Sequence, residues 1–123
     1  MAESMGEQLK SLLQTVEDQT GISEIAVVSK DGLLIASAMA GQYDPDLVAA
    51  MAAGMFGSAS NVAEQLLHAK PLQVLIETSK GRVVAVSAGD KAVIVALAPT
   101  ASNLGLILIE LRKAADKIAN IIE

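Results

Sequence analysis

Hydrophobic side chains recur every three or four residues in three stretches of the chain, a spacing that predicts amphipathic helices over residues 3–19, 44–68 and 103–122. The second helix has the clearest start, because Asp44 is a suitable N-cap residue and Pro45 fits the first helical position. The third begins with an apolar run that a strand could also contain. Its hydrophobic stripe continues at helical spacing towards the end of the chain, and we therefore expect a helix there, capped by Ser102 or Asn103.

Five shorter runs rich in Val, Ile and Ala predict β-strands, which cover residues 24–29, 33–38, 72–78, 82–87 and 92–98. An Asp-Gly turn joins the first two, and short separators join the last three, so that neighbouring strands pair as antiparallel hairpins. The strands are apolar on both faces, so both faces of their sheet must be covered. The 123 residues therefore predict a single domain, spanning 1–123, with an α/β fold. We expect a three-layer α/β/α sandwich with a five-stranded, mainly antiparallel sheet and the element order α-β-β-α-β-β-β-α.

The second predicted helix has an unusual distribution of side chains. On a helical wheel its larger apolar residues form one stripe, which we expect to face the sheet: Val48, Met51, Met55, Ala59, Val62 and Leu66. The opposite side is polar only in its C-terminal half, whereas its N-terminal half is uncharged and contains Gly54 and Gly57. Glycine inside a helix costs about 0.8–1 kcal/mol relative to alanine, a cost that usually accompanies close approach of another backbone. Burial within the domain would explain this face, but contact with another chain explains it better.

The predicted strand at residues 72–78 gives a second indication of a partner. Its apolar residues Leu72, Val74 and Ile76 are not accompanied by an inward-pointing charge. If this strand lies at the edge of the sheet, it is an unprotected template for pairing with another strand.

Composition restricts the chemistry that the chain can perform. It contains no cysteine and one histidine, His68, which excludes thiolate sites and argues against multi-histidine metal sites and a Ser-His-Asp triad. The formal net charge of −5 argues against binding to nucleic acid or to anionic membranes. Only Tyr43 and Phe56 are aromatic, so the core is built from smaller side chains and self-association would supplement its stability. No signal peptide or membrane span is apparent, and we expect a cytoplasmic protein.

Three segments, taken with the element order, resemble the roadblock/LC7 domain family. They are the hairpin Lys30-Asp-Gly-Leu-Leu-Ile-Ala-Ser37, the alanine-rich helix Leu47–Phe56 and the sequence Ala-Ser-Asn-Leu-Gly-Leu at residues 101–106. The resemblance covers about residues 5–122 and is strongest to the free-standing, MglB-like prokaryotic members.

This resemblance implies a homodimer whose second helices lie side by side and whose third strands join the two sheets. It further implies a small Ras-like GTPase as partner, with this protein acting as a GTPase-activating or other regulator or as a scaffold. On the helix, the implied partner surface comprises Ala49, Ala53, Phe56, Gly57 and Ser60. On the strand, it runs from Leu72 through Val74 and Ile76 to Thr78.

Two other classes of function stay open. A small-molecule-sensing domain of the same architecture is the main alternative, although the scarcity of aromatic residues argues against an aromatic-lined pocket. An enzyme is the weaker one, because the chain has no Gly-x-x-x-x-Gly-Lys-Ser/Thr phosphate loop and no identifiable partners for a catalytic His68. We expect the two arginines, Arg82 and Arg112, to be solvated charges rather than catalytic fingers. We therefore expect no catalytic residue, cofactor or metal.

Overall fold

The computed structural model describes residues 3–123 and has the predicted element order and layers. The elements are α1 (Met5–Thr20), β1 (Glu24–Ser29), β2 (Leu34–Met39), α2 (Pro45–Leu67), β3 (Gln73–Thr78), β4 (Gly81–Ala88), β5 (Ala92–Ala98) and α3 (Leu104–Ile122). The predicted capping residue of α2 is confirmed, because the Asp44 carboxylate accepts the Asp46 N–H at 3.0 Å. For α3 the cap is Asn103, whose side-chain oxygen accepts the Leu106 N–H at 3.1 Å.

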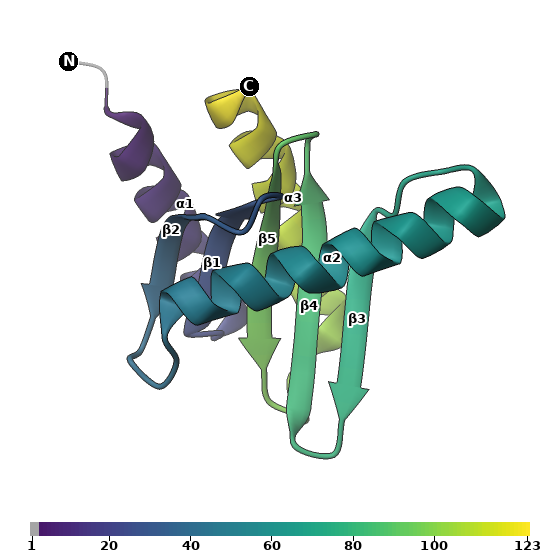
Figure 1. Ribbon diagram of the computed structural model, residues 1–123. Helices are drawn as coiled ribbons and strands as arrows, with labels where there is room; N and C mark the ends of the chain where they lie inside the picture. Colours follow the sequence, from purple (N-terminus) through teal and green to yellow (C-terminus); the bar gives the residue numbers. More distant parts are fainter. Residues whose placement is uncertain (1–2) are drawn as a thin grey trace.

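The strands form one sheet in the order β2-β1-β5-β4-β3, and every neighbouring pair is antiparallel (Figure 1). Both β2 and β3 are therefore edge strands. The register places Ile25 opposite Ala96 and Ala26 opposite Val95. Because successive residues of a strand point to opposite faces, the central strands supply apolar side chains to both sides of the sheet.

Helices α1 and α3 lie side by side on one face of the sheet, and α2 crosses the other face (Figure 1). The larger core lies beneath α1 and α3; its fully buried large side chains include Leu9, Leu13, Ile25, Val27, Val84, Ile94, Ile107, Leu111 and Ile118. The smaller core lies beneath α2 and consists of Ala26, Val28, Ala49, Ala52, Phe56, Ala85, Val93 and Val95. Small residues dominate this second core, so the backbone of α2 can approach the sheet closely.

The face of α2 that meets the sheet differs from the predicted stripe. Ala49 and Phe56 are buried in the core, whereas Met51, Val62 and Leu66 are 66%, 57% and 74% exposed. Placing the last three against the sheet was therefore wrong, as was placing Ala49 and Phe56 on the outer side.

Two physical reasons explain the difference. Small residues of α2 and of the sheet make most of this contact, and Phe56 is the one large side chain in the buried cluster. The C-terminal end of α2 also extends past β3, the last strand, so the sheet does not cover that end of the helix (Figure 1). A helical wheel shows only the hydrophobicity of the helix itself, so it indicates neither the size of the opposing residues nor where the sheet ends.

We expect Phe56→Ala to destabilise the protein by about 3–5 kcal/mol, because it removes the one aromatic ring of the α2-side core and leaves a cavity. The matched change Met51→Ala, on the same helix but exposed, should alter stability by no more than about 0.5 kcal/mol. Urea unfolding followed by circular dichroism measures both. Similar losses in the two variants would contradict the orientation of α2.

Candidate protein-interaction surface

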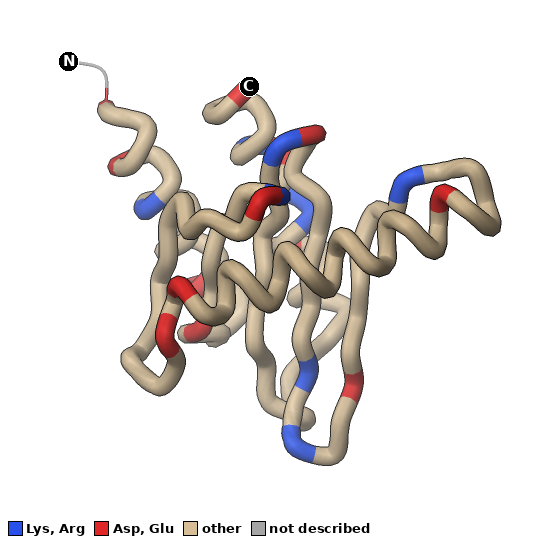
Figure 2. Tube along the Cα trace, viewed as in Figure 1, with Lys and Arg blue, Asp and Glu red and all other residues tan. Residues whose placement is uncertain are grey.

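The outer surface of α2 carries many exposed apolar residues and has no charge over residues 47–63. No charged residue occurs between Asp46 and Glu64, and Figure 2 shows this segment as an uninterrupted uncharged tube across the sheet. We call its exposed residues the α2 surface: Leu47, Met51, Gly54, Gly57, Val62, Leu66 and Leu67. An exposed apolar area of this extent is typical of a protein-interaction site.

The structure distributes the predicted helix-surface residues over three environments. Ala49 and Phe56 are buried and have no surface to offer a partner. Ala53 and Ser60 are half-buried, and Gly57 is exposed. A Cβ built at Gly57 would meet no atom within 4 Å, so a partner backbone could approach the helix closely there. On the helix, the predicted partner surface thus reduces to Ala53, Gly57 and Ser60, beside the larger exposed residues of the α2 surface.

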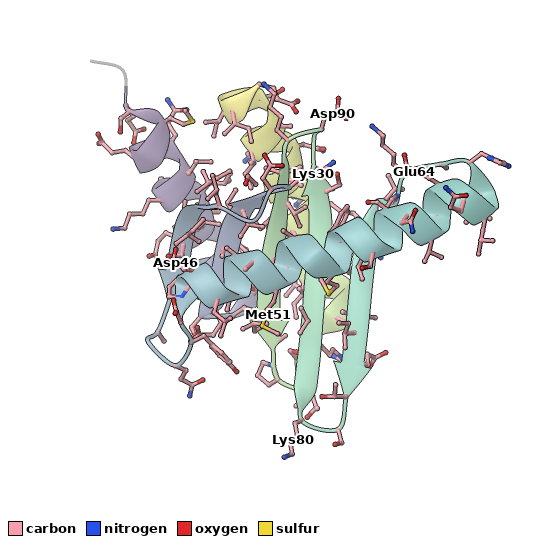
Figure 3. The ribbon with its side chains drawn as sticks, in the orientation of Figure 1. Lys30, Asp46, Met51, Glu64, Lys80 and Asp90 are labelled. Atoms are coloured by element: carbon pink, nitrogen blue, oxygen red, sulfur yellow. The ribbon has the colours of Figure 1, made fainter. Side chains whose placement is uncertain are left out.

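The turn between β1 and β2 covers one side of α2. A Cβ built at Gly32 would lie 3.7 Å from Ala50 Cα and 3.7 Å from Ala53 Cβ, so the turn backbone already packs on the helix. The Lys30 ammonium lies 6.0 Å from the centroid of the Phe56 ring, a cation–π distance. In Figure 3 Lys30 and Met51 lie on opposite sides of α2. The side of the helix that carries Met51 is therefore the more open one.

Edge strand β3 continues this apolar surface. Leu72 is 81% exposed and Ile76 is 41% exposed, while Val74 is half-buried against the α2-side core. Val74 lies opposite Ala85 and Ile76 opposite Val83, so both point to the α2 face of the sheet. The end of α2, where Leu66 and Leu67 are exposed, and the α2 face of β3 therefore lie at the same edge of the sheet (Figure 1).

The two edges of the sheet are not equivalent. On β2 the register shifts between Val27 and Val28, which leaves Ile35 as a bulge, and both α1 and α2 contact this strand. Bulges and covering helices discourage pairing with a further strand. On β3 the register with β4 is continuous from Gln73 to Thr78, and its outer backbone is open. The condition stated for residues 72–78 is therefore met, since β3 is an edge strand, and it is the better template for β-pairing.

Both arginines are engaged within the chain. Arg82 Nε lies 3.2 Å from Glu77 Oε2, and its guanidinium also donates to the Ser102 carbonyl at 2.8 Å. Its side chain is only 19% exposed, so the expectation of a solvated charge was wrong. Arg112 donates twice to Gln73 Oε1, at 3.1 and 2.6 Å. These contacts fasten β3 and β4 to α3 and its preceding loop.

His68 ends α2 in a left-handed conformation, with its N–H bonded to the Glu64 carbonyl at 3.2 Å. Within residues 3–123, no three His, Cys, Asp or Glu side chains gather closely enough to hold a metal ion. No helix in this part of the chain is long and apolar enough to cross a membrane.

One buried charge was missed by the sequence analysis. Glu24, the first residue of β1, is 7% exposed and lines a hollow of about 650 Å³ at the end of the sheet. The signal in the sequence was that Glu24 begins a strand whose following residues are apolar on both faces, so a charge there lies next to the core.

Comparison with known proteins agrees with the fold. The Roadblock/LC7 domain model matches residues 8–98. The uncharacterized protein MJ0714 of Methanocaldococcus jannaschii is 38% identical over 118 residues, which cover 96% of this chain and 97% of that protein. Among solved structures, Myxococcus xanthus MglB has a TM-score of 0.89 at 22% identity, covering 98% of this chain and 92% of that one. A structure described as MglB with tetrameric arrangement has a TM-score of 0.88 at 18% identity, with the same coverage.

We expect Gly32→Ala to destabilise the protein by about 1–2 kcal/mol, because a side chain at φ +96° is strained, while its Cβ would make only ordinary contacts with Ala50 and Ala53 of α2. The control is Gly6→Ala, which meets no atom within 4 Å in helix α1 and should be neutral or slightly stabilising. Thermal unfolding of both variants measures the difference. A Gly32→Ala protein as stable as the parent would show that the turn does not require a positive φ at residue 32.

Proposed function

This chain belongs to the Roadblock/LC7 domain family, and we propose that it is a homodimeric regulator or scaffold that binds a small Ras-like GTPase. The observation that carries the proposal is the uncharged α2 surface, which is continuous with the open edge of β3. Such a surface suits binding to another protein, and its apolar side chains have no groups that could catalyse a reaction.

The dimer joins β3 to β3 of a second copy, so that the two sheets become continuous. Backbone N–H and C=O groups on the open side of β3 then gain partners. The overhanging end of α2, with Leu66 74% exposed and Leu67 75% exposed, comes to rest on the second copy rather than on water. The regular register of β3 and the bulge on β2 support this choice of edge.

The proposal of a GTPase partner is supported by the family and by the MglB-like fold. It also draws on the lack of a phosphate-binding loop in this sequence. The sequence has no phosphate-binding loop, so it would act on the nucleotide of another protein. Arg82 and Arg112 are both bonded within the chain, so neither is free to serve as an inserted arginine finger. Any acceleration of GTP hydrolysis would therefore come from positioning the catalytic groups of the GTPase itself. Such a partner would place this protein in the cytoplasm.

We expect light scattering at micromolar concentration to give about twice the 12.7 kDa chain mass. Ile76→Lys and Leu66→Glu should each shift the protein towards the monomer, because each places a charge in the proposed seam between the two copies. The control Met5→Glu changes a residue that is 51% exposed on α1, on the opposite layer, and should leave the mass unchanged. A monomeric parent protein would overturn the dimer.

We expect Gly57→Arg to reduce capture of the GTPase by more than about a hundredfold, because an unpaired charge inside a protein contact costs several kcal/mol. The position is exposed and open, so the variant should fold. The assay uses an immobilised small Ras-like GTPase from the same organism, loaded with GDP or with a non-hydrolysable GTP analogue.

The matched control for that assay is Glu64→Arg, which introduces the same cation two turns further along α2, on its polar end. It should retain capture of the GTPase. Light scattering on both variants separates loss of the dimer from loss of GTPase binding. A folded Gly57→Arg protein that captures every tested GTPase as well as the parent does would remove α2 from the proposed interface.

A further inference from the structure

Helix α2 covers only part of the sheet face that it crosses. Val74, Ala85 and Val95 lie side by side on β3, β4 and β5, and they belong to or pack against the core beneath α2. Two residues away on each strand, the register aligns a second row on the same face, which we call the open row: Ile76, Val83 and Leu97. Ile76 is 41% exposed and the other two are half-buried. The open row is therefore an apolar strip that the helix of the same chain leaves accessible.

The C-terminal end of α2 has a sheet-facing residue but no sheet to contact. Leu67, the last residue of the helix, follows Phe56 by eleven residues, which is about three helical turns. Both residues therefore lie on the side of α2 that meets the sheet. Phe56 is 3% exposed, but Leu67 is 75% exposed, because the end of α2 extends past β3 (Figure 1). Leu67 thus continues the sheet-facing side of the helix beyond the edge of this chain's sheet.

The dimer proposed above would bring these two features together by symmetry. Antiparallel pairing of β3 with β3 of a second copy places a twofold axis perpendicular to the joined sheet. Such an axis keeps both α2 helices on one face and sets the Gln73 end of each β3 beside the Thr78 end of the other. Helix α2 crosses β3 near its Gln73 end, since Val74 packs against the α2-side core and Ile76 is exposed. The end of α2 from the second copy would therefore reach this chain at the Thr78 end of β3, where the open row begins.

We propose that the open row is the docking site for the C-terminal end of α2 from a second copy, with Leu67 of that copy packed on Ile76 and Val83. This inference rests on the proposed dimer through β3 and assigns to it a second, reciprocal contact. The contacting side chains are apolar, so the contact buries no unpaired charge. Parallel pairing of the two β3 strands would put the helices on opposite faces and leave both features exposed.

The area that a stable dimer needs also favours this contact. A standard protein interface buries roughly 800 Å² on each partner. Strand β3 has six residues, and its pairing covers only the outer backbone of one strand on each copy. The two reciprocal contacts between Leu67 and the open row add apolar area on the face of the sheet. They begin on β3 itself, at Ile76, so the helix contact is continuous with the strand seam.

The test uses the absence of cysteine from the chain. The double variant Leu67→Cys/Val83→Cys is treated with a short bismaleimide cross-linker and separated on a denaturing gel. We expect a covalent dimer to form at least about tenfold faster than in the control Leu67→Cys/Ile109→Cys, because docking raises the effective concentration of the two thiols. Ile109 is 50% exposed on α3, which covers the opposite face of the sheet. Equal rates in a protein that light scattering shows to be dimeric would overturn the docking and leave the β3 dimer standing, whereas a monomeric parent protein would overturn both.

A second variant tests the contact without changing any residue of the sheet. Leu67→Ser should raise the dissociation constant of the dimer at least about tenfold, because it removes a side chain that is buried only in the dimer. The control Leu33→Ser changes a residue that is 70% exposed between β1 and β2, away from β3, and should leave the constant unchanged. Analytical ultracentrifugation over a dilution series measures both. An unchanged dissociation constant for Leu67→Ser would overturn the docking even if the variant with Val83→Cys fails to fold.

Discussion

A sheet that is apolar on both faces must be covered twice, and in this protein the two covers are unequal. Helices α1 and α3 together shield one face over a core of large aliphatic residues. Helix α2 alone covers the other face, over a core built largely from Ala and Val. Helix α2 crosses the sheet and projects past β3, so the end of the helix and the α2 face of β3 leave apolar surface at that edge. The candidate protein-interaction surface follows from this imbalance.

The two edges of the sheet also differ in how well they could pair with a second copy of the chain. The β2 edge carries a bulge and is contacted by two helices, whereas the β3 edge is regular and open. The end of α2 projects past the same open edge with Leu66 and Leu67 exposed. Strand pairing and helix packing with a second copy would therefore satisfy both features at one margin. This leaves the central, uncharged part of the α2 surface for a different protein partner.

The groups that look reactive in the sequence have structural roles here. Arg82 and Arg112 hold the β3–β4 hairpin against α3 and its preceding loop, and the backbone of His68 closes α2. The buried side chain that lacks a hydrogen-bond partner is instead Glu24, at its Oε2 atom. A regulator built in this way would act by binding and positioning, with chemistry supplied by its partner.

The sequence by itself determined the elements, their order and the three-layer architecture. Those features depend on local properties: the 3.6-residue and 2-residue periods, the Asp-Gly turn, and caps such as Asp44. Sequence also indicated that residues 72–78 suit an open edge and that the early part of the second helix suits a partner.

Only the tertiary structure decided which side of α2 meets the sheet. The predicted stripe placed Met51, Val62 and Leu66 inward, but contact depends on the size of the opposing residues and on where the sheet ends. The same holds for Arg82, whose partner Ser102 is twenty positions away, and for Glu24, which is buried by segments that meet only in the fold. Periodicity describes one segment at a time, whereas burial is set by whatever segment lies opposite it.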